Sequence, residues 1–270
     1  MKEPPSSAEK HEFWQRLSRN RLLLSLLSLL LFLLIWQVLV MVLNLPGFIL
    51  PSPAEVGTKF LDVLRTGLLW RHFSSTLGEI LLGLLFGISA ATLLGYALSK
   101  SPLAERLLSP FLVGSQSIPM AAIAPLLVIW FGPGLLSKVL ICSLIVFFPV
   151  LVNTLVGLRD VSPELREVMR SLRATPAQML RYLEIPAALP VFLGGLRVGA
   201  SLSVIGAIVG ELVASDRGLG FLINVGRGQY DTALVFVAVI CLVALAAGLY
   251  GLVLLLENRV LSWQTWRKEI

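Results

Sequence analysis

Charge is scarce in this sequence. Asp, Glu, Lys and Arg make up 14% of the 270 residues, whereas 56% are hydrophobic, and the mean hydropathy is +0.85. A soluble domain of this size needs far more charge to cover its surface. The composition therefore argues against an ordinary soluble globular protein and favours one that lies in a membrane.

Cysteine and histidine are also rare. Cys142 and Cys241 fall inside long apolar runs, so we expect them to behave as small apolar residues, without a disulfide or a metal site. His11 and His72 lie in peripheral segments, and we expect no functional role for either. The sequence contains no G-x-x-x-x-G-K-[ST] phosphate loop. We therefore expect no catalytic residue, metal or cofactor in this chain.

Long uncharged runs dominate what the sequence does contain. The run 22–43 would extend about 33 Å as a helix, enough to cross the hydrocarbon core of a bilayer. Its length and the lack of a cleavage site favour a retained helix over a signal peptide. Runs of this kind predict about six transmembrane helices, at 22–43, 76–98, 107–131, 138–158, 189–212 and 233–256. The fold class is therefore all-α integral membrane.

Basic residues are divided unevenly between the two sides of these spans. With the N-terminus inside the cell, 15 Lys and Arg residues lie in cytoplasmic segments and six in external segments, while Arg197 lies within a span. The positive-inside rule then predicts that both termini are cytoplasmic. The net charge of +6 is accounted for by orientation and by anionic headgroups, without nucleic acid.

Two features stand out in the predicted external segments. Ser52 and Pro53 are typical of a helix start, and the following residues predict an amphipathic helix on the outer surface. Its apolar face comprises Val56, Phe60, Val63 and Leu64. After the fifth span, "GLGFLINVG" is too short to cross a membrane and suggests a surface-lying or re-entrant segment.

Small residues recur every fourth position in the second span, at Gly83, Gly87, Ala91 and Gly95. Membrane helices associate closely where small side chains let their backbones approach. We interpret this ladder as a tight helix–helix seam. The alternative is the ordinary enrichment of glycine in membrane helices.

Polar residues beside prolines suggest a lining for a translocation pathway. Prolines kink helices and free backbone carbonyls, which membranes tolerate beside neighbouring helices or a water-lined cavity. The pathway candidates are Ser115, Gln116, Ser117, Pro119, Asn153 and Glu211. The alternatives are a kinked structural helix with locally paired polar groups and, for Glu211, a solvated helix end.

Residues 159–188 form a dense charged island between the fourth and fifth spans, and they predict two short helices. In the first helix, Ser162 can act as the cap and Pro163 occupies the first position. Glu164 and Glu167 then complement the positive end of the helix dipole. Loops without a task are usually shorter, so this hairpin suggests a docking element for another protein.

The second helix of the island begins with a capping box, Thr175-Pro-Ala-Gln178. We expect it to run to about Glu184, where Pro186 stops it. An apolar stripe of Met179, Leu180 and Leu183 would provide the buried part of a docking contact.

This hairpin resembles the "EAA" loop of ATP-binding cassette (ABC) importer permeases. Glu167 begins the motif, with Val168 and Met169 in place of its two alanines. Arg173 stands where the motif has glycine, and "LEIP" supplies its apolar-x-apolar-Pro close. The departure at Arg173 puts the packing of the hairpin in question.

The resemblance extends from about residue 76 to 258. "SIPMAAIAPLLVIWFGPG" and "GELVASDRGLGFLI" are similar to the subgroup that imports nitrate, sulfonates, taurine and thiamine precursors. "GRGQYDTALVFVAVI" is similar to members for vitamins or pyrimidine precursors. The expected divisions are a cytoplasmic tail (1–21), the first span with an external amphipathic segment (22–75), the permease core (76–258) and a cytoplasmic tail (259–270).

The resemblance implies a type I ABC importer permease fold in the bacterial inner (plasma) membrane. It implies a second permease copy in a homodimer, two cytoplasmic ATPase subunits that bind ATP and Mg²⁺, and an external substrate-binding protein. The residues assigned to ATPase coupling are Glu164, Glu167, Met169, Arg170, Arg173, Ala174, Thr175, Gln178 and Met179.

Two other classes are weighed against this interpretation. A stand-alone secondary transporter or channel needs charged groups within the membrane as an ion or proton relay, and the predicted spans offer almost none. A purely structural scaffold leaves the capped hairpin without a purpose. The sequence leaves the identity of the solute open.

Overall fold

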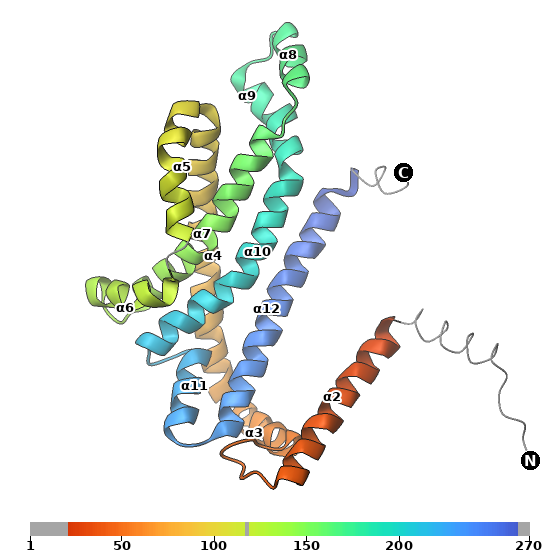
Figure 1. Cartoon of the computed structure of the whole chain (residues 1–270), viewed down its shortest axis with the longest axis vertical. Coiled ribbons are helices and arrows are strands. Elements are labelled where there is room, and N and C mark those ends of the chain that lie inside the picture. Colours follow the sequence, from red (N-terminus) through yellow and green to blue (C-terminus); the bar gives the residue numbers. More distant parts are fainter. Residues whose placement is uncertain (1–20, 117–118, 264–270) are drawn as a thin grey trace, which may run out of the picture.

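The computed structural model describes residues 21–116 and 119–263, and every regular element in that part is a helix (Figure 1). The long helices are α2 (Arg21–Leu43), α4 (Leu68–Lys100), α7 (Leu135–Arg159), α10 (Ile185–Val213) and α12 (Thr232–Val260). Five helical stretches are long and apolar enough to cross a membrane. The predicted all-α membrane fold is therefore confirmed.

The predicted third span, 107–131, is not one continuous helix. Helix α5 (Pro102–Gln116) ends before Pro119, and α6 (Met120–Phe131) begins after it. Pro119, the residue before α6, has extended backbone, with ψ of 115°. An α-helix cannot continue through a residue with this backbone, so a new helix starts at Met120. Since α4 and α7 run toward the same end of the bundle in Figure 1, α5 and α6 together return the chain between them.

Helix α7 lies between α4 and α10 and packs along both. The four small residues of the ladder in α4 are buried and lie on the side that faces α7. A Cβ atom added to Gly87 would lie 2.8 Å from the carbonyl oxygen of Ser143, and one added to Gly95 would lie 2.9 Å from Cβ of Thr154. The missing side chains therefore allow the close approach of α4 and α7.

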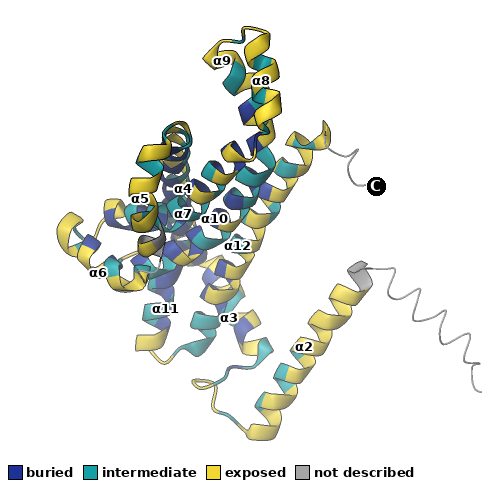
Figure 2. Ribbon diagram, turned by 45° about the horizontal axis from the view of Figure 1, so that its top comes forward, coloured by how far each residue is buried: buried dark blue, intermediate teal, exposed yellow. Residues whose placement is uncertain are grey.

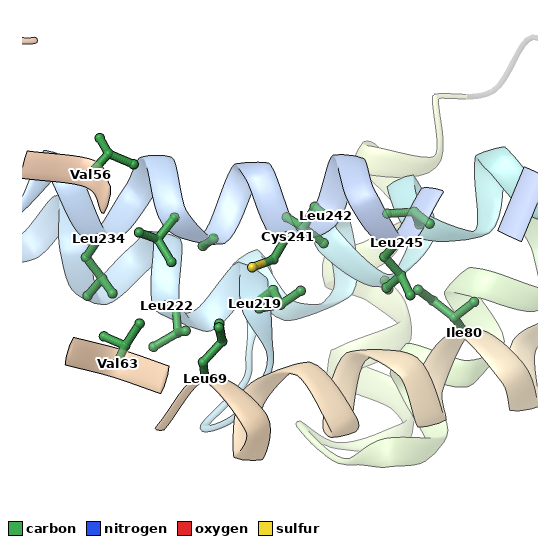
Figure 3. Close-up of a cluster of buried hydrophobic side chains, with 14 of the residues drawn as sticks. Val56, Val63, Leu69, Ile80, Leu219, Leu222, Leu234, Cys241, Leu242 and Leu245 are labelled. Atoms are coloured by element: carbon green, nitrogen blue, oxygen red, sulfur yellow. The ribbon is translucent and has the colours of Figure 1, made fainter. Parts of the chain in front are cut away.

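Two short helices cover one end of the bundle, which we call the α11 end. Helix α3 (Pro53–Arg65) packs against α12 and α4, and α11 (Leu219–Gly228) packs against α12, α10 and α4. Side chains from these helices form a continuous apolar cluster (Figure 3). The predicted start of α3 is confirmed, because Ser52 and Glu55 form a complete capping box.

Helix α2 stands apart from the rest of the bundle, and most of its residues are exposed (Figure 2). It is attached near its C-terminal part by Trp36. The indole of Trp36 stacks on Phe236 of α12 at 5.1 Å between ring centroids, and its Nε1 donates to the carbonyl of Pro51 at 3.0 Å. The exposed apolar side chains of α2 suit contact with lipid.

The hairpin (159–188) projects from the opposite end, which we call the hairpin end (Figure 1). It contains α8 (Pro163–Ser171) and α9 (Pro176–Met179). In Figure 1 the start of α2 and the end of α12 point toward this end as well.

The expectation that Pro186 stops the second hairpin helix is wrong. A π-helical segment, η1 (Leu180–Glu184), joins α9 to α10 without a break, and the stretch Pro176–Val213 is helical over 38 residues. Proline removes one N–H and crowds the carbonyl four residues earlier. Here the N–H of Ile185 bonds to the carbonyl of Leu180, and this wider turn relieves that crowding before Pro186.

Candidate functional site

The first helix of the hairpin is capped as predicted. Ser162 accepts a hydrogen bond from the N–H of Leu165 at 3.4 Å, and its hydroxyl donates to the carboxylate of Glu164. These contacts lie on the surface of the protein. The hydrogen bond from Ser162, followed by one from the backbone N–H of Glu164, lowers the pKa of the Glu164 carboxyl.

The end of α8 explains the position of Arg173 in the motif. The backbone N–H of Ala174 bonds to Met169 and that of Arg173 bonds to Arg170, which is a Schellman ending. This ending needs a left-handed residue, and Arg173 has a φ of 56°. Glycine is favoured there because of its backbone freedom. The side chain of Arg173 is exposed, so the substitution strains the backbone rather than the packing of the hairpin.

The predicted capping box of α9 is confirmed. The N–H of Thr175 donates to Oε1 of Gln178 at 2.8 Å, and the N–H of Gln178 donates to Oγ1 of Thr175 at 3.3 Å. This reciprocal pair fixes the turn between the two hairpin helices.

An exposed apolar row on α8 was missed in the sequence. Leu165 and Val168 of α8 and Leu172, the C-cap residue that follows it, are 52%, 55% and 73% exposed. Their spacing of three and four places them on one face. The predicted stripe of Met179, Leu180 and Leu183 is instead half-buried. The apolar periodicity of "ELREVMRSL" was the signal that could have identified this row.

The nine residues assigned to coupling lie together in the hairpin. The exposed members are Glu164, Glu167, Arg170, Arg173, Thr175 and Gln178, and the half-buried members are Met169, Ala174 and Met179. Figure 2 shows that most of the hairpin is open to its surroundings.

The pathway candidates whose side chains are described belong to different parts of the bundle: Pro119 precedes α6, Asn153 lies in α7 and Glu211 in α10. Asn153 donates to the carbonyl of Pro149 in its own helix at 2.8 Å and lies against Gly195 of α10. Pro119 is exposed at the start of α6. Ser117 lies outside the described residues, and of Ser115 and Gln116 only the helical backbone is described.

Glu211 is fully buried, so its interpretation as a solvated helix end is wrong. It belongs to a network of polar side chains at the α11 end. Oε1 of Glu211 accepts from the hydroxyl of Thr76 at 2.6 Å, and Oε2 accepts from the N–H of Gly220 at 2.5 Å. Glu211 therefore connects α10 to both α4 and α11.

The same network holds the first N–H groups of α11. The N–H of Gly218 donates to Nδ1 of His72 at 3.0 Å, and the N–H of Leu219 donates to Oγ1 of Thr76 at 2.8 Å. Helix starts leave such groups without partners in their own helix. Here α4 and α10 supply the acceptors, and the carboxylate of Glu211 also lies at the positive end of the α11 dipole.

A buried ion pair completes the network. Nζ of Lys138 in α7 contacts the carboxylate of Glu79 in α4, and the two side chains are 6% and 0% exposed. Lys138 also donates to Oγ of Ser215, in the segment between α10 and α11, at 3.0 Å. The network thus ties α4, α7, α10 and α11 together. We define it by His72, Thr76, Glu79, Lys138, Glu211 and Ser215.

Most of this network was missed at the level of sequence. The expectation that the spans carry almost no charge is wrong at the α11 end, because Glu79 and Lys138 lie inside long helices. The expectation that His72 is peripheral is also wrong, since it is buried and stacks on Phe221. A charge inside an apolar run is itself a signal of a buried partner.

Comparison with known proteins agrees with this architecture. Residues 83–262 match the family model "Binding-protein-dependent transport system inner membrane component". An amino acid ABC transporter of known crystal structure has the same fold, with a TM-score of 0.57 and 22% identity over 74% of this chain and 98% of that chain.

Several relatives resemble the chain over most of its length. The riboflavin transport system permease protein RibX of Chloroflexus aurantiacus is 46% identical, over 88% of each chain. The formylaminopyrimidine transport permease protein ThiX of Halalkalibacterium halodurans is 35% identical, over 88% of this chain and 94% of that protein. The taurine transport system permease protein TauC of Escherichia coli is 34% identical, over 84% of each chain.

These matches decide between the three classes that the sequence left in competition. A secondary transporter and a scaffold are excluded, and partner proteins that hydrolyse ATP and bind the solute follow from the family. The chain belongs to the inner membrane components of binding-protein-dependent transport systems: it is the permease subunit of an ABC importer for a small solute, not its ATPase.

Proposed function

We propose that the hairpin is the cytoplasmic docking element through which two ATPase subunits drive this permease. The observation that carries the proposal is the exposed apolar row of α8, flanked by exposed charges, at the end of the bundle opposite α11. Exposed apolar side chains that are surrounded by charged residues commonly mark a surface that binds another protein.

The two parts of this surface have different tasks. Leu165, Val168 and Leu172 provide the apolar contact that is buried in the complex. Glu167 and Arg170 steer the partner and fix its register. ATP and Mg²⁺ are bound by the partner ATPase. Its closure shifts the permease between inward-open and outward-open states by no more than the difference in its affinity for the two states.

Substitution Glu167→Arg tests this docking role. It reverses one exposed charge, so we expect the chain to insert and fold while solute uptake and copurification of the ATPase are both lost. Asp62→Arg is the matched control for copurification of the ATPase, which it should leave intact, because Asp62 is an exposed acidic residue on α3 at the other end. Normal uptake by the Glu167→Arg variant, with an intact complex, would contradict the proposal.

We also propose that the hairpin end faces the cytoplasm, with both termini on that side. The 15-to-6 distribution of basic residues supports this orientation. Cys142 and Cys241 are buried, so a new exposed cysteine can be labelled selectively. In intact cells, a membrane-impermeant maleimide should label Thr58→Cys and leave Ala177→Cys unlabelled until the cells are opened. The reverse pattern would overturn the orientation.

The assembly proposed here contains two copies of this permease and an external binding protein at the α11 end. Pro119 and much of α6 are exposed in the single chain, which leaves one side of the pathway to be closed by the second copy. Crosslinking between two Pro119→Cys chains tests this, and a mass corresponding to one permease per complex would contradict it.

For the solute, we propose a planar aromatic heterocycle rather than a small sulfonate. The support is the higher identity to permeases named for riboflavin and formylaminopyrimidine, 46% and 35%, than to the one named for taurine, 34%. Uptake of labelled riboflavin by cells that express the complete transporter should be unaffected by excess taurine. Competition by taurine alone would favour the sulfonate class.

A further inference from the structure

The network at the α11 end contains more buried acid than buried base. Glu79 and Glu211 are both 0% exposed, and the buried cation of the network, Lys138, contacts Glu79. Two ionised carboxylates beside one ammonium group leave a net negative charge in an apolar surrounding. Such a charge is strongly destabilising when it is not compensated.

The neighbouring titratable groups do not supply the missing positive charge. Nδ1 of His72 accepts a hydrogen bond from Gly218, so that nitrogen carries no proton and the imidazole is neutral. Arg217 is 56% exposed and lies 3.6 Å from the exposed carboxylate of Asp216. Arg71 is exposed on α4. Each of these groups is neutral, paired or open to the surroundings.

The hydrogen bonds of the two carboxyl groups point to the same imbalance. Oε1 of Glu79 accepts a hydrogen bond from Nζ of Lys138 and a second one, at 3.3 Å, from the hydroxyl of Ser75. Oε2 of Glu79 is buried and, within the described part of the chain, receives no donor. The carboxyl groups of Glu79 and Glu211 lie close enough to interact with each other. Two ionised carboxylates are both acceptors, so a proton on one of them would supply the donor that this part of the network lacks.

From this geometry we propose that Glu79 and Glu211 form a proton-binding site that holds one shared proton beside Lys138. The proton gives the network zero net charge, supplies a donor between the two carboxyl groups and leaves the other contacts of Glu211 in place. Like-charged carboxyls at short distance commonly behave in this way.

Two features of the surroundings fit a proton rather than a metal ion. Among the described residues, no group of three or more His, Cys, Asp or Glu side chains is arranged to hold a metal, and the ammonium group of Lys138 already occupies the cationic position. A cavity of about 490 Å³ lies against Glu79 and Lys138 and is also lined by Ser75, Asp216 and Arg217. It gives protons a route between the site and the surface at the α11 end.

Infrared spectroscopy of the purified full-length chain in lipid tests the proposal. At neutral pH the wild-type protein should show the C=O stretching band of one protonated carboxylic acid, shifted in D₂O. The band should be lost in Glu79→Gln and in Glu211→Gln, because each leaves one carboxylate to balance Lys138. In Lys138→Met the intensity of the band should rise to roughly that of two protonated carboxylic acids, because both carboxyl groups then need a proton to be neutral.

The matched control is Glu184→Gln at the hairpin end. Glu184 is also buried, but it is paired with Lys100 as one acid with one base, so its removal should leave the band unchanged. Absence of the band from the wild-type protein, or its persistence in both Glu79→Gln and Glu211→Gln, would overturn the proposal. The measurement uses the purified chain without the ATPase and without transport, so its outcome does not depend on whether the proposed docking role of the hairpin is correct.

Thermal unfolding against pH gives a second readout. The folded protein keeps the shared proton at pH values where the unfolded chain has already released it, so wild-type stability should fall as pH rises from the ordinary carboxyl range to the pH at which the shared proton is lost. Glu211→Gln should remain flat over the same range, because its amide can donate to Glu79 without a titratable proton. Parallel curves for the two proteins would contradict the shared proton.

Discussion

The two ends of the bundle hold buried charge in different ways. At the hairpin end, Lys100 donates to both carboxylate oxygens of Glu184, at 2.6 and 2.7 Å, and 45% of the lysine side chain is exposed. At the α11 end, Lys138 is enclosed with two carboxyl groups. The difference indicates that the hairpin end can adjust its conformation when a partner binds. The geometry of the α11 end is instead fixed by its buried hydrogen bonds and ion pair.

The largest effect is expected from removing the enclosed lysine. Lys138→Ala leaves Glu79 buried without its cation, and losing one partner of a buried pair costs about 3–5 kcal/mol. Lys100→Ala is the matched variant at the hairpin end, and its cost should be clearly smaller because water reaches that site. Thermal unfolding of the purified chain in detergent measures both. Equal losses would remove the contrast between the two ends.

Gly218→Ala should have the next largest effect. Gly218 has a φ of 111°, and an added Cβ would overlap the carboxyl group of Glu211. Backbone of this kind is nearly restricted to glycine, so we expect a loss of about 2–3 kcal/mol. Gly228→Ala, at the other end of α11, has open space around its Cβ position and should be nearly neutral. Unfolding in denaturant compares the two.

Arg173→Gly should shift stability in the opposite direction. It relieves the left-handed strain at the end of α8 and should stabilise the hairpin locally by about 1 kcal/mol. Hydrogen exchange of the α8 amides should slow, while exchange in the α11 amides stays the same. An unchanged or faster exchange in α8 would show that the arginine side chain contributes more than its backbone costs.

The smallest effect concerns the cap of α8. The pKa of Glu164 is lowered chiefly by the hydroxyl of Ser162. A carboxyl of this kind stabilises the folded state above its ordinary pKa, and the contribution is lost as pH falls through the lowered value. The protection factors of the α8 amides, which correct for the intrinsic pH dependence of exchange, should therefore fall slightly in acid. Ser162→Ala should remove most of this dependence.

Features encoded by neighbouring residues were predictable from the sequence. The caps at Ser52, Ser162 and Thr175 depend on residues three positions apart, and the spans depend on uninterrupted apolar runs. The break at Pro119 and the continuation past Pro186 were not, because proline either ends a helix or is absorbed by a wider turn. Which of these happens depends on tertiary packing.

The buried network was less accessible to sequence reasoning because it joins residues far apart in the chain. Glu79 and Lys138 are 59 positions apart, and Thr76 and Glu211 are 135 apart. Glu211 was identified as a candidate because it stands at the edge of a span. Its partners look like ordinary helix-end residues until α4, α7 and α10 are brought together.

The unbroken helical stretch from Pro176 to Val213 has a mechanical consequence. Its 38 residues extend about 57 Å at 1.5 Å per residue, so one rod begins in the turn of the hairpin and carries Glu211 near its far end. A rotation or axial displacement applied at Thr175 is either absorbed by bending of the π-helical segment at 180–184 or transmitted along the helix to Glu211. The stiffness of those five residues therefore determines how much of the displacement reaches the α11 end.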